Sequence, residues 1–397
     1  MFVESGDSFS FFLPPYVVFG RGKRATIPDY ANRLGLKKVL LVVDPFFAGT
    51  KYLPELQKGL NDVGIESTVW SGVVPDPTDV SVDDAAGVYK NAGCHGVICI
   101  GGGSAMDTGK SVGILIASGA KSIREHLPPT YRSVNGMAPV ICVPTTGGTG
   151  AEVNPYAIVT NTETHKKGLA YAGWELLAAQ RVAVVDPDLT ASMPPTLTAI
   201  TGVDALCHAL ECYITGAPLG APNPISDDLA LRAIHLVATN LRRAVFDGQD
   251  MKARTNMSLA AMLATMAFPN AGLTHCHCLN EVLVESFGIS HGEAVGSVLV
   301  ATLEVFLPFR TERLAEVAQS FGVPTAGKSQ RETAEAGIGE IRQLMREVGF
   351  PSLSEAVRGK KVDIDALMQD FLGRYPQFNP PNQAKRIRYT LERSLEL

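Results

Sequence analysis

The first half of the chain alternates short apolar runs with helix-like segments. Apolar runs, rich in β-branched residues, cover 37–44, 95–103, 138–150 and 181–189, and each has the length of a buried strand. Helix-like segments such as 80–93 and 105–119 lie between them. Strands that alternate with helices predict a parallel sheet with helices packed on it, an α/β fold.

The pattern changes after Pro187, where long stretches rich in alanine and leucine have helical character and convincing strands are absent. We therefore predict two domains. Residues 1–190 form an α/β domain of the Rossmann-like, dinucleotide-binding kind, and residues 191–397 form an all-helical domain that carries metal and substrate.

Composition and charge narrow the class of protein. The 397 residues are 46% hydrophobic and 19% charged, which is typical of a globular chain. A net charge of −5 gives no electrostatic reason to expect nucleic acid or an anionic membrane as a partner. The N-terminal residues lack the basic region of a signal peptide, and we expect no apolar run of the roughly 20 residues that cross a bilayer. Seven scattered cysteines without a CxxC pair favour the reducing cytoplasm.

Two glycine-rich loops follow predicted strands. The segment "GGGSAMDTGK" exposes the amides of residues 101–104 at the start of a helix, where the helix dipole favours an anion. The segment "PTTGGTGAE" (144–152) adds further amides and three threonine hydroxyls. One such loop is explained equally well by a tight turn, but two at strand ends predict a ligand with phosphates.

The loops leave the ligand open between a dinucleotide and a nucleoside triphosphate. Met106 occupies the third glycine position of the GxGxxG pattern, and the P-loop spacing is one residue too long, although Lys110 favours that alternative. Asp44 ends a predicted strand, where an acid accepts hydrogen bonds from a ribose and repels a 2′-phosphate. This position favours NAD over NADP, although Asp44 precedes the glycine loop instead of following it.

The predicted helix 201–214 carries the first candidate metal ligands. Asp204 and His208 are four residues apart, so both side chains lie on one helix face and can chelate a divalent ion. A surface pair of aspartate and histidine would have the same spacing.

The segment "NAGLTHCHCLNEVLVESFGISHGE" (270–293) carries two more histidines. On an unbroken helix His277 and His291 would be about 21 Å apart, too far to share an ion. A helix break is predicted between them, because Gly288 is a plausible C-cap and Ser290 with Glu293 has the spacing of a capping box. The break would turn His291 back toward His277.

One carboxylate and three imidazoles suit Fe²⁺ or Zn²⁺, and Mn²⁺ is also compatible. These side chains belong to Asp204, His208, His277 and His291. We interpret the neighbouring cysteines as buried free thiols that do not bind the metal; they are Cys207, Cys276 and Cys278. His275 is expected to face away from the metal position.

The ordered motifs resemble the iron-dependent (group III) alcohol dehydrogenases along nearly the whole chain. The matching segments are "LPPYVVFGRG", "VVDPFFAGT", "GGGSAMDTGK", "PTTGGTGAEV", "VDPDLTASMP", "TGVDALCHALECYI" and "NAGL…HG". The resemblance implies that Asp204, His208, His277 and His291 bind Fe²⁺ and that Asp44 lies by the adenosine ribose. It also implies that Gly102, Gly103 and Ser104 hold the pyrophosphate, with further cofactor contacts from Asp107, Thr145, Thr146, Thr149 and Lys167. Family members commonly form dimers or larger assemblies through N-terminal strands, for which residues 11–20 are the candidate.

One position departs from the family. Glu281 replaces a histidine that the family usually has four residues after the third metal ligand, where it is implicated in proton relay. Glu281 is therefore expected to relay protons, to add a ligand, to repel anionic substrates, or to be a solvated carboxylate above the site.

The resemblance implies an NAD-dependent, metal-dependent oxidoreductase that interconverts a small primary alcohol and its aldehyde, with His277 and Glu281 as catalytic residues. Lactaldehyde and diol-type aldehydes fit this prediction. The alternative substrates are the anionic aldehydes phosphonoacetaldehyde and sulfoacetaldehyde. A basic cluster of Lys385, Arg386 and Arg388 offers weak support for them, because a charged helix face explains the same cluster as well. Dehydroquinate synthase and glycerol dehydrogenase, which use related sheets and Zn²⁺, remain further readings of the same fold.

Overall fold

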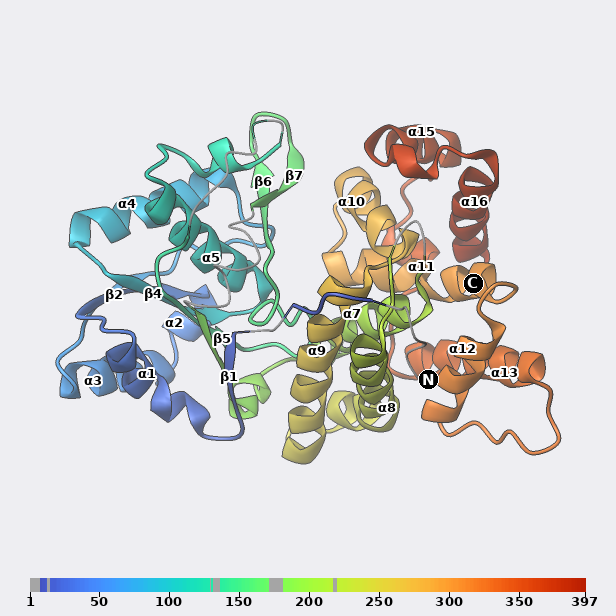
Figure 1. The fold of residues 1–397 in the computed structure, drawn as a ribbon, viewed down its shortest axis with the longest axis horizontal. Coiled ribbons are helices and arrows are strands. Elements are labelled where there is room, and N and C mark those ends of the chain that lie inside the picture. Colours follow the sequence, from blue (N-terminus) through green and yellow to red (C-terminus); the bar gives the residue numbers. More distant parts are fainter. Residues whose placement is uncertain (1–7, 13–14, 129, 131–135, 171–180, 217–219) are drawn as a thin grey trace. The chain divides into compact units, whose positions relative to one another are not determined.

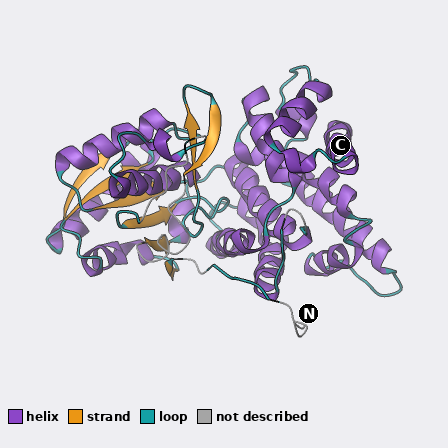
Figure 2. Cartoon of the chain, turned by 45° about the horizontal axis from the view of Figure 1, so that its top comes forward, coloured by secondary structure: helices purple, strands orange, loops and turns teal. Residues whose placement is uncertain are grey.

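The computed structural model describes residues 8–12, 15–128, 130, 136–170, 181–216 and 220–397. The chain divides into two compact units, Phe12–Ala191 and Ser192–Leu397, and the second also includes the N-terminal residues up to Phe11. Within the described residues, all strands belong to the first unit (Figure 2). The sequence had predicted a division at residue 190. The expected architecture, a parallel sheet followed by a mostly helical half, is confirmed.

The first unit is built on a six-stranded parallel sheet with the order β1-β8-β5-β4-β2-β3. The central strands are apolar and buried, apart from Lys38 at the start of β2, because helices cover both faces of the sheet. The strands are β1 (Tyr16–Phe19), β2 (Lys38–Val43), β3 (Glu66–Trp70), β4 (Gly96–Gly101), β5 (Val140–Pro144) and β8 (Arg181–Val185).

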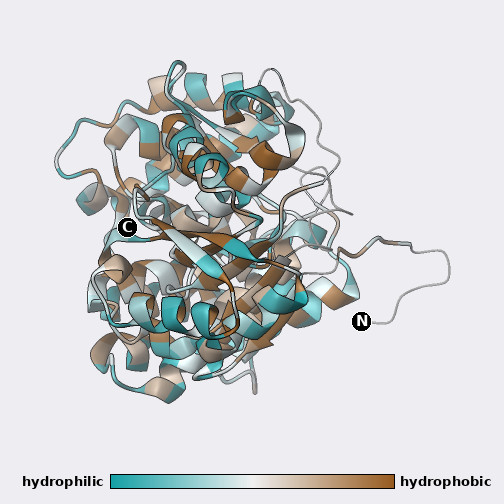
Figure 3. Cartoon of the chain, turned by 90° about the vertical axis from the view of Figure 1, so that its left-hand side faces the viewer, coloured by the Kyte–Doolittle hydropathy of each residue, from teal (hydrophilic) through white to brown (hydrophobic). Residues whose placement is uncertain are grey.

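Helices α4 (Asp79–Ala92) and α5 (Gly103–Ser118) lie on one face of the sheet, and α1 (Ile27–Arg33) and α3 (Tyr52–Asp62) lie on the other (Figure 1). Strand side chains alternate between two apolar clusters, one on each face. Figure 3 colours each residue by hydropathy, with hydrophobic residues in brown and hydrophilic residues in teal.

The strand order creates a ligand-binding position at the carboxyl ends of β2 and β4. The chain leaves β2 toward β3 at one edge of the sheet, and it leaves β4 toward β5 in the opposite direction. In open α/β sheets, ligands bind in the crevice where the connections diverge in this way. Asp44 and Gly101 lie at this crevice, because the two strands pair with Val43 opposite Ile100.

The sequence analysis missed an antiparallel hairpin, β6 (Ala157–Asn161) and β7 (Lys166–Ala170), and the edge strand β3. Both are polar or half-exposed, so neither shows the apolar run that identified the central strands. The hairpin is tied to the segment before α4 by the Thr160 amide, which donates to the carbonyl of Pro77 at 2.8 Å.

The second unit is helical, as predicted, and α7 (Pro195–Ile214) lies in its apolar core. Among the described helices, α7 alone is long and apolar enough to cross a membrane. However, 83% of its most apolar 18-residue segment is buried inside the protein, as in the core helix of a globular protein. The other helices are α8 (Pro224–Phe246), α9 (Met251–Ala271), α10 (His275–Phe287), α11 (His291–Phe306), α12 (Thr311–Ser320), α13 (Gln330–Glu347), α14 (Leu353–Ala356), α15 (Ile364–Arg374) and α16 (Pro381–Glu396).

Candidate metal centre and cofactor loops

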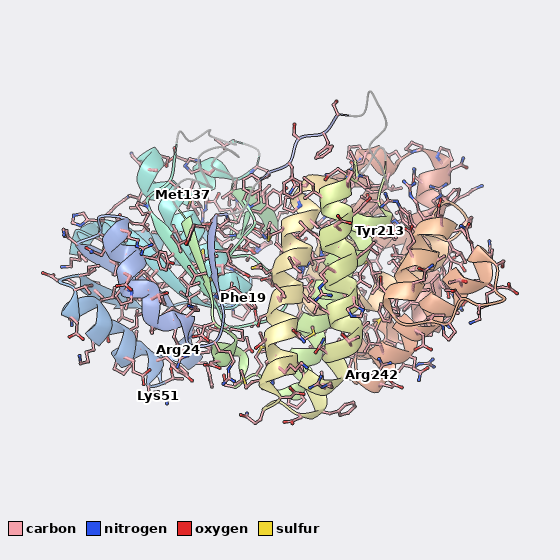
Figure 4. The ribbon with its side chains drawn as sticks, turned by 60° about the horizontal axis from the view of Figure 1, so that its bottom comes forward. Phe19, Arg24, Lys51, Met137, Tyr213 and Arg242 are labelled. Atoms are coloured by element: carbon pink, nitrogen blue, oxygen red, sulfur yellow. The ribbon has the colours of Figure 1, made fainter. Side chains whose placement is uncertain are left out.

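Helix α7 presents a polar stripe in an otherwise apolar environment. Asp204 and His208 lie one helical turn apart and are 2% and 4% exposed. Tyr213, near the C-terminal end of the same helix, is labelled in Figure 4. Two buried polar side chains on one face of a core helix need partners, and those partners come from α10 and α11.

The helix break predicted between His277 and His291 is present. Gly288 ends α10 in the left-handed conformation, with φ of 63°, and a capping box of Ser290 and Glu293 begins α11. His291 is the first residue of α11, so its side chain returns toward the start of α10, where His277 lies.

The structure brings the four predicted ligands together. One side-chain nitrogen or oxygen from each residue lies within 4.8 Å of the others; the residues are Asp204, His208, His277 and His291. The Oδ1 atom of Asp204 is 3.3 Å from Nε2 of His291 and 3.9 Å from Nε2 of His277. The rings of His208 and His277 stack, with centroids 4.5 Å apart.

Unpartnered polar atoms show that this site suits a cation. Asp204 Oδ1, His208 Nδ1 and His277 Nε2 are buried without a hydrogen-bond partner among the described residues. A buried polar atom without a partner is costly, and a divalent ion would satisfy such atoms. One carboxylate and three imidazoles also match the donor types that Fe²⁺ and Zn²⁺ accept.

The electrostatics keep Asp204 and His208 in the protonation states that bind a metal. Burial alone would raise the pKa of Asp204, but the imidazoles of His208 and His291 outweigh burial and lower it. Burial lowers the pKa of His208 to about 4, against the attraction of Asp204. At neutral pH the carboxylate is therefore charged and the His208 imidazole is neutral, as metal ligation requires.

The sequence analysis missed Glu211, a fully buried carboxylate on the same face of α7. Its Oε2 accepts hydrogen bonds from the Thr274 amide at 2.9 Å and the Thr274 hydroxyl at 2.6 Å. Its Oε1 contacts Nδ1 of His277. Spacing could have revealed it, since Glu211 follows His208 by three residues and therefore lies on the same face.

The residues that flank the ligands have other partners. His275 Nε2 lies 2.9 Å from the Thr390 hydroxyl, and the Cys276 thiol donates to the Val295 carbonyl. Burial raises the pKa of Cys276 and of Cys207, so both remain protonated thiols. Neither sulfur belongs to the cluster of four.

In the first unit, the β2 and β4 ends meet at Gly101 and Asp44. Gly101 has φ of 154°, and a Cβ there would lie 2.6 Å from Ala105 Cβ and 2.9 Å from Asp44 Cβ. Only glycine fits this conformation and this contact. The Asp44 carboxylate accepts from the Phe46 amide at 2.9 Å, which fixes it at the mouth of the crevice.

The two glycine-rich loops touch each other. Helix α5 begins after Gly102, with Gly103 and Ser104 in its first turn and no side-chain cap. A Cβ at Gly103 would lie 2.9 Å from the Thr149 methyl group, and the Thr145 amide donates to the Gly101 carbonyl. Thr146 approaches Gly102 in the same way. The structure thus brings the predicted pyrophosphate and threonine contacts to one place, around the N-terminus of α5, which has no side-chain cap among the described residues.

Lys110 does not serve a phosphate. Its side chain is fully buried, and its ammonium group donates to the Ala151 carbonyl at 3.0 Å and to Asn154 Oδ1 at 3.1 Å. Asp107 lies 3.0 Å from the same ammonium group. A P-loop lysine must reach the phosphates, so these contacts argue against the nucleoside triphosphate alternative. Lys167 pairs with Asp76 at 2.6 Å, and its contact with a cofactor stays a prediction.

Glu281, on α10, is half-buried, and it lies close enough to Tyr375, the residue after α15, to act on the pKa of its hydroxyl. Burial raises the pKa of Tyr375, and the negative charge of Glu281 raises it further. Glu281 lies outside the cluster of four candidate ligands.

In the basic cluster of α16, Arg388 pairs with Asp365 and Arg386 lies over the Phe309 ring, which supports a charged helix face.

Comparison with known proteins identifies the family. The family model "Iron-containing alcohol dehydrogenase" matches residues 14–187, and the C-terminal model "Fe-containing alcohol dehydrogenase family" matches residues 198–391. A choline dehydrogenase from Bacillus subtilis is 32% identical over 89% of this chain and 87% of its own length. A lactaldehyde reductase from Escherichia coli is 33% identical over 96% of both chains. A crystal structure of 1,3-propanediol oxidoreductase superposes with a TM-score of 0.89 at 30% identity, covering 98% of this chain and 100% of that chain. The chain belongs to the iron-containing alcohol dehydrogenase family and is an oxidoreductase that acts on alcohols and aldehydes.

Proposed function

We propose that the protein is an NAD-dependent dehydrogenase of small primary alcohols, working with Fe²⁺, and that it also reduces the corresponding aldehydes. The observation that carries this proposal is the convergence of one carboxylate and three imidazoles within 4.8 Å, where three of their atoms are buried without a hydrogen-bond partner among the described residues. The names of the relatives support short hydroxylated substrates, including lactaldehyde and propanediol-type compounds.

The residues would divide the chemistry between binding and proton transfer. When bound, a divalent metal supplies Lewis-acid activation of the substrate oxygen, and nicotinamide supplies the hydride donor or acceptor. Asp204, His208, His277 and His291 would hold that metal. Glu281, one helical turn beyond His277, would accept or release the hydroxyl proton, and Tyr375 would orient its carboxylate.

NAD is preferred over NADP in this proposal because of Asp44. Its carboxylate is held at the carboxyl end of β2, beside the glycine loop, where a ribose would lie. A 2′-phosphate at that position would meet a negative charge. Replacement of Asp44 by glycine is expected to raise the affinity for NADP relative to NAD.

A reconstitution experiment tests the function. Protein stripped of metal is loaded separately with Fe²⁺ or Zn²⁺ and assayed with NADH against lactaldehyde, propanal, 3-hydroxypropanal, sulfoacetaldehyde and phosphonoacetaldehyde, and with NAD⁺ against choline. We expect turnover of the neutral aldehydes only in metal-loaded protein. Metal-stripped protein that is as active as the loaded form would contradict the proposal, as would Asp204→Asn protein with full activity. Turnover restricted to the two anionic aldehydes would instead support the alternative substrate class.

We also propose a homodimer or larger homo-oligomer in the cytoplasm. Strand β1, which ends at Phe19 (Figure 4), is the edge of the sheet, and its Tyr16 is 62% exposed. An exposed strand edge is a natural place for a second copy to pair. Part of the expected contact segment, residues 13–14, lies outside the described residues. All seven cysteines are free, which supports a reducing compartment. Sedimentation analysis of wild type and of a Val17→Pro variant tests the assembly.

A further inference from the structure

We propose that Glu211 is a positioning residue for His277: it fixes the tautomer and direction of this imidazole and thereby strengthens divalent metal binding. This inference rests on the metal site of the proposed function. It concerns a residue that contributes none of the four converging atoms.

The Glu211 carboxylate is held from several sides. Oε2 accepts from the Thr274 amide, the Thr274 hydroxyl and, at 3.3 Å, the His277 amide, while Oε1 contacts His277 Nδ1. Thr274 is also the N-cap of α10. Glu211 therefore connects the ligand-bearing face of α7 to the first turn of α10, and its position is fixed by donors from the backbone as well as from side chains.

This contact decides which nitrogen of His277 faces the metal position. An ionised carboxylate is only an acceptor, so Nδ1 must carry the proton. The lone pair then resides on Nε2, the atom that is buried without a partner and lies 3.9 Å from Asp204 Oδ1. A carboxylate on the outer N–H of a ligating histidine orients the ring and makes the inner nitrogen a better donor.

His208 provides an internal comparison. Its ring is held by stacking on Phe268 and His277, and no carboxylate of the described residues is hydrogen-bonded to it. His277 is thus the imidazole that a buried carboxylate anchors. Burying the Glu211 charge is expensive, and no lysine or arginine of the described residues pairs with it. A cation at the metal position would compensate that charge through the imidazole.

The test measures metal affinity and not only turnover. Glu211→Gln protein is stripped of metal, and its Kd for Zn²⁺ is measured by competition with a chromophoric chelator. We expect binding 10- to 100-fold weaker than wild type, together with altered visible absorption bands in the Co²⁺-loaded protein, since the donor strength of His277 changes. Thr274→Ser, which keeps the hydroxyl that holds Glu211, is expected to retain both properties.

A matched control separates positioning from folding. Glu304→Gln removes ion pairs to Arg342 and Arg393 in the same unit, away from the ligand cluster, and is expected to lower the Tm of the apo protein without changing the Kd for Zn²⁺. A Kd for Glu211→Gln within twofold of wild type overturns the inference, as does a weaker Kd with an unchanged Co²⁺ spectrum.

If Glu211→Gln fails to fold, Glu211→Asp serves instead. It keeps the charge but is too short to reach both Thr274 and His277, so it should also bind Zn²⁺ more weakly, and wild-type affinity would overturn the inference. Failure of wild-type protein to bind any divalent metal would instead refute the proposed function itself.

Discussion

Three polar side chains on one face of α7 account for most of the chemistry at the residue scale. Asp204, His208 and Glu211 are spaced by four and three residues, so they form one stripe along a helix of 3.6 residues per turn. The first two point to the cation position and the third supports His277 from outside. A single helix thus fixes two ligands and the partner of a third.

The Glu281 carboxylate is open to a direct test. We expect Glu281→Gln to lower turnover and to change the pH profile of turnover, because the amide keeps the shape of the side chain but cannot exchange a proton. Metal content should stay at the wild-type level, since Glu281 is outside the ligand cluster. Steady-state kinetics from pH 6 to 10 and metal analysis check both statements.

Tyr375→Phe is the companion variant, because it removes the hydroxyl that lies near Glu281 and leaves the carboxylate in place. A smaller effect on turnover is expected, with the pH dependence retained. An unchanged pH profile for Glu281→Gln would remove this residue from proton transfer.

The four candidate ligands could be predicted from the sequence, whereas the contacts made by their supporting residues could not. Ligand spacing on a helix and a capping signature are local properties, and they located Asp204, His208, His277 and His291. Glu211 bonds to Thr274, and Tyr375 lies near Glu281, across elements that are distant in sequence. Such pairs depend on how the helices pack, which no local pattern records.

At the scale of elements, the break between α10 and α11 positions His291. We expect Ser290→Ala to lower the free energy of unfolding by about 1 kcal/mol through loss of the capping box. It should also weaken metal binding, because His291 is the first residue of the helix that Ser290 caps. Chemical denaturation and the Kd for Zn²⁺ measure the two effects.

The matched variant is Ser329→Ala, which removes the equivalent capping box of α13. A comparable loss of stability with unchanged metal affinity is expected there. Equal effects on metal binding in both variants would mean that the cap acts only through global stability.

Asp79 connects three elements of the α/β unit. This buried carboxylate accepts from the Val80 amide at the start of α4 and from the Thr162 amide after β6, and it pairs with Arg124. Burial by itself would raise the pKa of Asp79, but hydrogen bonds from Arg124 and Thr162 outweigh burial and lower the pKa.

A lowered carboxyl pKa stabilises the fold above the usual pKa, and this contribution is lost as the pH falls through the folded-state value. Asp79→Asn is therefore expected to lower the free energy of unfolding by about 1–3 kcal/mol at pH 7. The difference from wild type should shrink below about pH 4. Urea denaturation at pH 7 and at acidic pH tests this, and a difference that grows on acidification would contradict it.

Elements were predictable where their apolar pattern was strong. The buried strands β2, β4, β5 and β8 show it because both faces are covered. Strand β3 pairs with β2, β6 pairs with β7, and Asp79 accepts from the Thr162 amide beside the hairpin, while these short strands mix polar with apolar residues. Their existence depends on partners, so no local pattern predicted them.

At the scale of the whole molecule, metal removal should act on one unit. The four candidate metal-binding residues all belong to Ser192–Leu397. A metal that binds only the folded state stabilises it by about 2.7 kcal/mol at 100 times its Kd. We expect the apo protein to exchange amide hydrogens faster in α7, α10 and α11. Strands β4 and β5 should keep their protection, and hydrogen-exchange mass spectrometry distinguishes the two regions.

NAD⁺ provides the converse perturbation. It should protect the first turn of α5 in metal-free protein, since the glycine loop belongs to the other unit. If metal or NAD⁺ changed amide exchange equally in both units, this would contradict the assignment of metal binding to one unit and NAD binding to the other.

The contact between Gly103 and Thr149 has a consequence for protein engineering. Because a methyl group at position 103 would collide with the Thr149 side chain, each loop has the shape that the other one permits. In a chimera that receives only one of these loops from a homologue, the two loops would no longer fit each other. Single replacements made to change cofactor preference would meet the same steric conflict. Libraries should therefore vary residues 101–104 and 144–152 as one inherited block.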